Sequence, residues 1–169
     1  MVKQLFLPLA AVAAFIVLVG LMVQGKIGNF KPIYNPEQNS ASQTDSKIVK
    51  IDKVEIEVEV AKTDEERKLG LSGRKSLENN AGMLFVLPSN SKPTFWMKDT
   101  LIPLDIIWIK DAKIVKIDEN VPTQIGANSS DLKLYPAPGV VDFVLEVNAG
   151  FSEENSIDTN SIFQMQFDL

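Results

Sequence analysis

The chain has 169 residues, of which 45% are hydrophobic and 23% charged, and its net charge of −5 opposes binding to nucleic-acid phosphates. It contains no cysteine, which excludes disulfides, thiol nucleophiles and zinc–thiolate sites. It also contains no histidine, the commonest general base and metal ligand at neutral pH. The composition therefore favours a binding domain over an enzyme, and we expect no cofactor, no metal site and no nucleic-acid partner.

The N-terminal segment predicts a membrane anchor. Residues 5–23 carry no charged side chain and, as a helix, are long enough to cross the hydrocarbon core of a bilayer. We therefore predict a transmembrane anchor or signal segment over residues 1–24, with an uncleaved anchor favoured over a cleaved, secreted form or a soluble cytoplasmic protein. The flanking lysines are nearly balanced, and we expect a single-pass protein whose C-terminal domain lies outside the cytoplasm.

A flexible linker is predicted over residues 25–47, which are rich in Asn, Ser, Gln, Pro and Gly and show no apolar period. Residues 48–169 form a single predicted domain with 13 basic and 20 acidic side chains, a net charge of −7. This charge repels an anionic membrane surface. We therefore expect the membrane to be contacted through residues 5–23 alone, and the domain to meet an envelope polymer or another envelope protein.

The first half of the domain predicts two strands and a short helix. Residues 54–60 alternate apolar and acidic side chains, which is typical of a strand with one wet face. Thr63 and Glu66 then fit a capping box, and Gly70 fits the end of the helix that they begin. The apolar run at residues 83–87 predicts the next strand.

The second half predicts a hairpin, a long irregular loop, a helical turn and two more strands. In chain order these are the hairpin 104–110 and 113–119 around Asp111-Ala112, the loop 120–139, the strand 140–147, the helical turn 149–155 and the strand 161–167. Asp142 and Glu146 are expected on a solvated face of their strand. Short strands, two short helices and frequent turns predict a mainly β domain of sandwich or barrel type.

Four sequence blocks carry a resemblance to a known family. They are GLSGRKSL (70–77), AGMLFVL (81–87), FWMKDTLIPLDIIWI (95–109) and APGVVDFVLEVNAG (137–150). In this order and spacing they resemble the domain-of-unknown-function family 192 over about residues 50–168. The resemblance implies an antiparallel β-sandwich or barrel of jelly-roll type with short helices, and an unassigned activity. It also implies a domain that often follows a signal or a single membrane span.

The stretch FWMKDTLIPLD (95–105) is the candidate site. As a strand it directs Trp96 and Lys98 to the face opposite the core. A tryptophan among polar neighbours suits either a ligand platform or a lid over a second small core. Asp99, where many family members have Asn, and Thr100 suit a tight turn held by their own side chains.

Asp105 enters a strand that is apolar on both faces, so its carboxylate must be paired or lie at a wet end. Arg74 and Lys98 are the predicted partners, and the guanidinium of Arg74 suits bidentate pairing with a carboxylate. Two interpretations stay open for this cluster. It is either a structural salt bridge that locks the turn or a cluster that faces a substrate.

The main hypothesis is a non-catalytic module that binds a ligand or a partner. Its candidate residues are Arg74, Trp96, Lys98, Asp99, Thr100, Asp105 and Tyr135. One alternative is a hydrolase or lyase that acts on saccharides, with Asp105 as a weak candidate for the catalytic acid or base. The other alternative is a structural accessory domain of the envelope.

Overall fold

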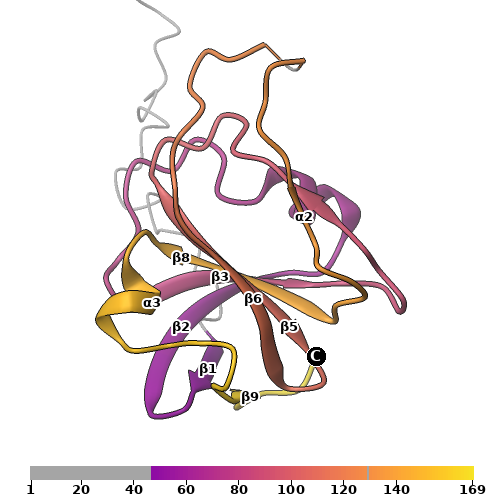
Figure 1. Ribbon diagram of the computed structural model, residues 1–169, viewed down its shortest axis with the longest axis vertical. Coiled ribbons are helices and arrows are strands. Elements are labelled where there is room, and N and C mark those ends of the chain that lie inside the picture. The colour runs from indigo at the N-terminus through magenta and orange to yellow at the C-terminus, as the bar shows by residue number, and fades with distance from the viewer. Residues whose placement is uncertain (1–46, 129) are drawn as a thin grey trace, which may run out of the picture. The chain divides into compact units, whose positions relative to one another are not determined.

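The computed structural model describes residues 47–128 and 130–169, whose arrangement is shown in Figure 1. The predicted anchor and the linker up to residue 46 lie outside the described residues. In the described part, no helix has both the length and the apolar character that crossing a membrane requires.

The described residues fold into one large sheet, one small sheet and two short helices. The large sheet contains β1 (Lys47–Ile51), β2 (Val54–Ala61), β3 (Ala81–Val86), β5 (Leu104–Lys110), β6 (Lys113–Val121), β8 (Phe143–Asn148) and β9 (Phe163–Met165), in the order β6-β5-β8-β3-β2-β1-β9. The small sheet pairs β4 (Thr94–Phe95) with β7 (Tyr135–Pro136). The helices are α2 (Asp64–Leu69), on the right of Figure 1, and α3 (Phe151–Glu154), on the left.

The prediction of a mainly β domain with two short helices is confirmed, but the topology differs from the antiparallel sandwich or barrel of jelly-roll type. The large sheet is not wholly antiparallel, because β2 and β3 run parallel. Residues 62–80, which include α2, separate the two strands, and a connection of this length can return the chain to the starting edge. The seven strands also form one curled sheet instead of two packed sheets (Figure 1).

The two edge strands of the large sheet approach each other at one end. Lys113, the first residue of β6, forms a bridge with Ile162, which precedes β9. The N–H of Phe163 donates a 3.0 Å hydrogen bond to the carbonyl of Ala112, in the turn before β6. The sheet is therefore a half-barrel whose edges are joined at this end.

Both faces of the middle strands are buried. The cluster inside the curl includes Ile114 and Phe163 from the two meeting edges, together with Ile56, Leu84, Ile107 and Leu145. The cluster on the outer face includes Phe85, Met97, Ile106, Trp108 and Val144. Leu71, Met97 and Tyr135 belong to the outer cluster and come from the long connections, so these connections cover the outer face of the sheet.

The predicted helix and hairpin are confirmed in their local detail. The side chain of Thr63 accepts a hydrogen bond from the N–H of Glu66, and the Glu66 carboxylate accepts one from the N–H of Thr63, which forms the capping box of α2. In the hairpin, Asp111 and Ala112 both have positive φ angles, 49° and 59°. Positive φ at both central residues is typical of the type I′ turn that matches the twist of paired strands.

Candidate functional site

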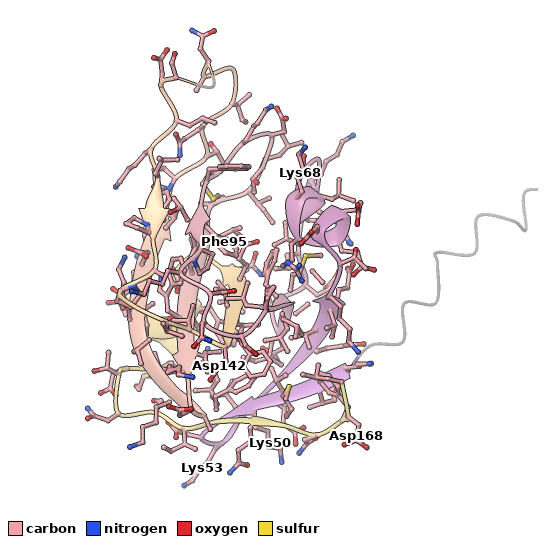
Figure 2. The ribbon with its side chains drawn as sticks, turned by 90° about the vertical axis from the view of Figure 1, so that its right-hand side faces the viewer. Lys50, Lys53, Lys68, Phe95, Asp142 and Asp168 are labelled. Carbon is pink, nitrogen blue, oxygen red and sulfur yellow. The ribbon has the colours of Figure 1, made fainter. Side chains whose placement is uncertain are left out.

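A pocket of about 440 Å³ opens among the connections that cover the outer face of the sheet. Its apolar lining includes Leu71, Phe85, Leu87, Phe95 and Trp96, and its charged lining comprises Asp64, Arg67, Lys68, Lys92, Lys98 and Glu146. Figure 2 shows two of these residues, Lys68 on α2 and Phe95 on β4, in the upper half of the view, away from Lys50 and Lys53. The volume lies within the range of small-molecule sites.

An aromatic stack fixes one wall of this pocket. The rings of Phe85 and Phe95 meet edge to face with their centroids 4.9 Å apart, and the ring of Phe95 meets Trp108 in the same way at 5.5 Å. Such pairs hold aromatic rings in a defined orientation. Trp96 follows Phe95 in the chain, lines the pocket and is 45% exposed. The pocket thus combines a packed aromatic wall with a solvent-accessible indole.

Glu146 lies on β8, in the middle of the sheet, and faces the pocket. Its neighbours in register are Met83 on β3 and Ile106 on β5, and only 5% of its surface is exposed. The expectation that Glu146 lies on a solvated strand face is wrong, because the connections between strands cover this face. Asp142, at the open end of the same face, is partly exposed and pairs with Lys110 at 2.7 Å.

The carboxyl group of Glu146 is not satisfied by the described part of the chain. No hydrogen bond or ion pair from a described residue reaches it, and burial among apolar side chains raises its pKa from 4.5 to about 8. A carboxyl group with this pKa is mostly protonated at neutral pH. It therefore offers one hydrogen-bond donor and one acceptor to the pocket.

The other charged groups of the pocket give it a positive lining. Lys68, Lys92 and Lys98 form no ion pair with any described residue, whereas Arg67 pairs with Asp64 and donates a 2.8 Å hydrogen bond to the carbonyl of Val86. With Glu146 neutral, cations outnumber anions around the pocket, although the domain as a whole has 13 basic and 20 acidic side chains. This local excess favours an anionic group on a ligand.

Three of the seven candidate residues, Trp96, Lys98 and Thr100, line the pocket. Asp99 lies beside it in the turn between β4 and β5, with a φ angle of 57°, and its carbonyl accepts a 2.8 Å hydrogen bond from the N–H of Gly73. Tyr135 is buried opposite Phe95 in the small sheet, belongs to the outer cluster and is not part of the pocket lining.

Asp105 and Arg74 lie apart from the pocket lining. The buried carboxylate of Asp105 accepts hydrogen bonds from the N–H groups of Asn120, Gly150 and Ser152, at 2.8, 3.1 and 2.9 Å. The predicted pairing of Asp105 with Arg74 or Lys98 is wrong, because these N–H groups, two of them at the start of α3, satisfy it instead. Arg74 pairs with Glu59, with Nη2 and Oε1 2.6 Å apart.

Metal binding finds no support in the described ranges. Within residues 47–128 and 130–169, acidic side chains do not gather in a group of three or more that could hold an ion. Asp105 already uses both oxygens for backbone N–H groups, and Asp64 pairs with Arg67. The lining of the pocket itself offers a buried carboxyl group, exposed lysines and an apolar wall.

Comparisons with known proteins show the family. The chain matches DUF192, described as Uncharacterized ACR, over residues 47–165. A solved structure from Sinorhizobium meliloti 1021, of a protein proposed to be a transcription regulator, is similar with a TM-score of 0.64 and 26% identity over 71% of this chain and 93% of that chain.

A protein of unknown function from Novosphingobium aromaticivorans DSM 12444 is similar with a TM-score of 0.63 and 30% identity, over 69% of this chain and 83% of that chain. The comparison with curated proteins found no match. The family match covers most of the chain and confirms the resemblance that the four sequence blocks indicate. The chain therefore belongs to the DUF192 family.

Proposed function

We propose that this domain binds a small anionic ligand with an apolar body in the pocket between α2, β4 and β8, and that it does so without catalysing a reaction. The observation that carries this proposal is Glu146, a buried acid that lines the pocket and has no hydrogen-bond partner among the described residues. An unsatisfied polar group in a protein interior costs free energy. Acids whose pKa is strongly shifted by burial gather at functional sites, and the carboxyl group of Glu146 opens to a pocket where a ligand can pair with it.

The lysines of the pocket support an anionic ligand. Lys68, Lys92 and Lys98 come from two separate segments and line one pocket, with no carboxylate partner in the described part of the chain. The aromatic wall formed by Phe85 and Phe95 suits an apolar or aromatic body. A ligand with its charge among the lysines and its body against this wall would use both features.

Two other roles receive less support. A saccharide hydrolase needs two carboxyl groups beside the scissile bond. Asp105, the candidate acid or base, is buried and accepts hydrogen bonds from three N–H groups, and Asp64 is paired with Arg67. We also do not propose a role in transcription on the strength of the Sinorhizobium meliloti protein, because a net charge of −7 opposes contact with DNA phosphates.

Calorimetric titration of the full chain in non-ionic detergent tests the anion preference. The probes are 3-phenylpropionate and 3-phenylpropylammonium, which share an apolar body and differ in charge. We expect the anion to bind about 10-fold more tightly than the cation. In the double variant K92Q/K98Q this preference should fall by about the same factor.

The matched control for these variants is Lys53→Gln, which removes an exposed lysine in the turn between β1 and β2, away from the pocket. This variant should bind both probes as the wild type does. Equal affinity of the wild type for the two probes would contradict the proposal. An unchanged anion preference in the double variant would contradict the assignment of the lysines.

We also propose that the ligand or partner is met outside the cytoplasm, in the envelope, with residues 5–23 as the membrane tether. Support comes from the uncharged apolar run and the polar linker that follows it. Protease treatment of spheroplasts, in which only the inner membrane remains as a barrier, followed by detection of a C-terminal tag, tests this arrangement. Cleavage of the domain is expected, whereas a domain protected in spheroplasts and cleaved after lysis would contradict it.

A further inference from the structure

The ligand's buried end is defined by the chemistry of Glu146. We infer that the pocket takes an acid whose apolar body ends in a primary amide or a lactam, with the Glu146 carboxylic acid donating its proton to the amide carbonyl and accepting a hydrogen bond from the amide N–H. This inference rests on the proposed function and names the ligand class of the same pocket.

A ligand can reach the carboxyl group of Glu146 only from the pocket. On the sheet, its neighbours in register are Met83 and Ile106, neither of which carries a hydrogen-bonding group that matches an acid. β8 lies between β3 and β5 and is hydrogen-bonded to both, so the backbone N–H and carbonyl groups around Glu146 are already paired. A partner for the carboxyl group must therefore come from the pocket side, where Glu146 is part of the lining.

A neutral carboxylic acid presents a donor and an acceptor side by side. A primary amide or a lactam presents the matching acceptor and donor on one edge, so two parallel hydrogen bonds can form. An ordinary trans secondary amide places its N–H and its carbonyl on opposite sides and can make only one of them. The geometry of the two groups therefore selects primary amides and lactams over open-chain peptide bonds.

An ammonium group is the main competitor, because it would pair with an ionised Glu146. The charged groups that line the pocket with Glu146 are Asp64, Arg67 and Lys68 from α2, and Lys92 and Lys98 from either side of β4. On the two neighbouring strands, the residues opposite Glu146 are Met83 and Ile106, which carry no charge. An entering cation would meet three lysines before it reached the acid, and the lysines instead favour a ligand with a negative outer end.

The protonation state of Glu146 should make binding of the amide depend on pH. Burial raises the pKa of this carboxyl group to about 8, so the donor proton is present at about pH 6 and mostly lost at about pH 9. The ionised form still accepts a hydrogen bond from the amide N–H, but it loses the donor to the amide carbonyl and repels the carboxylate end of the ligand. An amide-bearing ligand should therefore bind less tightly as the pH rises through this range.

The test compares 4-carbamoylbenzoate with 4-isopropylbenzoate, which has a similar size and the same charge but no amide. Both are titrated into the full chain in non-ionic detergent at about pH 6 and about pH 9, on either side of the raised pKa of Glu146. At the lower pH the carbamoyl probe should bind about 10-fold more tightly than the isopropyl probe. At the higher pH this preference should fall, because one of the two hydrogen bonds is lost.

Two substitutions separate the hydrogen bonds from the charge. Glu146→Gln retains a donor and an acceptor but does not titrate, so its preference for the carbamoyl probe should be the same at both pH values. Glu146→Met matches the apolar neighbours and should prefer the isopropyl probe. Equal binding of both probes to the wild type would contradict this inference alone. Binding of neither probe would contradict the proposed function itself.

Discussion

Glu146 lies directly opposite Met83 in the antiparallel register of β8 and β3. A carboxyl group thus occupies a position in the middle of the sheet where both neighbouring strands carry apolar side chains, since Ile106 lies opposite it on β5. Burial at this position raises the pKa of Glu146 to about 8. Two properties of the domain, its stability at different pH values and its pocket chemistry, should therefore depend on this one residue.

The first prediction concerns stability against pH. The pKa of Glu146 is higher in the folded protein, about 8, than its usual value of 4.5, so the folded state holds a proton that the unfolded state has released. The stability that this residue contributes is fully present below about pH 4.5. It is lost between there and about pH 8, with a maximal slope of about 1.4 kcal/mol per pH unit.

Urea denaturation of the full chain at several pH values in this window measures the slope. Glu146→Gln should remove the decline of the unfolding free energy that is due to this group. Glu119→Gln, which replaces an exposed glutamate of β6, should follow the wild type. Parallel curves for the wild type and Glu146→Gln would show that Glu146 ionises normally in the folded protein.

The second prediction concerns Asp105, whose carboxylate accepts three backbone hydrogen bonds. In Asp105→Asn the amide nitrogen cannot accept, so one buried N–H group faces another donor. We expect a loss of about 2–3 kcal/mol in the free energy of unfolding. Binding of 3-phenylpropionate by the folded fraction should be unchanged. A selective loss of binding with normal stability would instead indicate that Asp105 acts in the site.

The third prediction concerns the turn at Asp99, where the φ angle is 57° and the carbonyl accepts a hydrogen bond from Gly73. Asp and Asn tolerate this left-handed conformation, whereas a β-branched residue does not. Asp99→Val should reduce stability by about 1–2 kcal/mol. Asp99→Asn should stay within about 0.5 kcal/mol of the wild type. Similar melting temperatures for the two variants would exclude backbone conformation as the constraint at this position.

The fourth prediction concerns Thr63, which caps the helix that carries Lys68 to the pocket. Thr63→Ala removes the side-chain acceptor for the N–H of Glu66 and should reduce stability by about 1 kcal/mol. Thr63→Ser retains the hydroxyl group and serves as the matched control. Thermal unfolding followed by circular dichroism measures both variants, and an equal effect of the two would exclude the cap as the cause.

Local patterns explain what could be predicted from the sequence. The alternation over residues 54–60 appears in β2 as buried Ile56 and Val58 beside the exposed Glu55 and Glu57, because side chains on a strand alternate between its faces. The capping residues of α2 and the turn at Asp111-Ala112 also depend only on neighbours in the chain. Each of these features is specified within a few residues and is therefore visible without the fold.

Long-range features could not be predicted in this way. The parallel pairing of β2 with β3 and the pairing of β7 with β4 join segments that are distant in sequence. The hydrogen-bond partners of Asp105 are backbone N–H groups, which residue types do not reveal. Glu146 and Asp142 have the same place in the alternation of side chains along the strand. Only Glu146 is buried, because connections from other parts of the chain cover the sheet at its position. The only local indication that Glu146 is buried is its position between Leu145 and Val147 in an apolar run.

The central claim, that a neutral Glu146 receives the ligand, can be measured at the residue itself. The side-chain carboxyl ¹³C resonance of Glu146 in the full chain can be followed through a pH titration, with and without 4-carbamoylbenzoate. We predict a midpoint near pH 8 without the probe, and a higher midpoint with it, because a ligand that prefers the protonated form raises the pKa. A midpoint near pH 4.5 that does not respond to the probe would contradict the account.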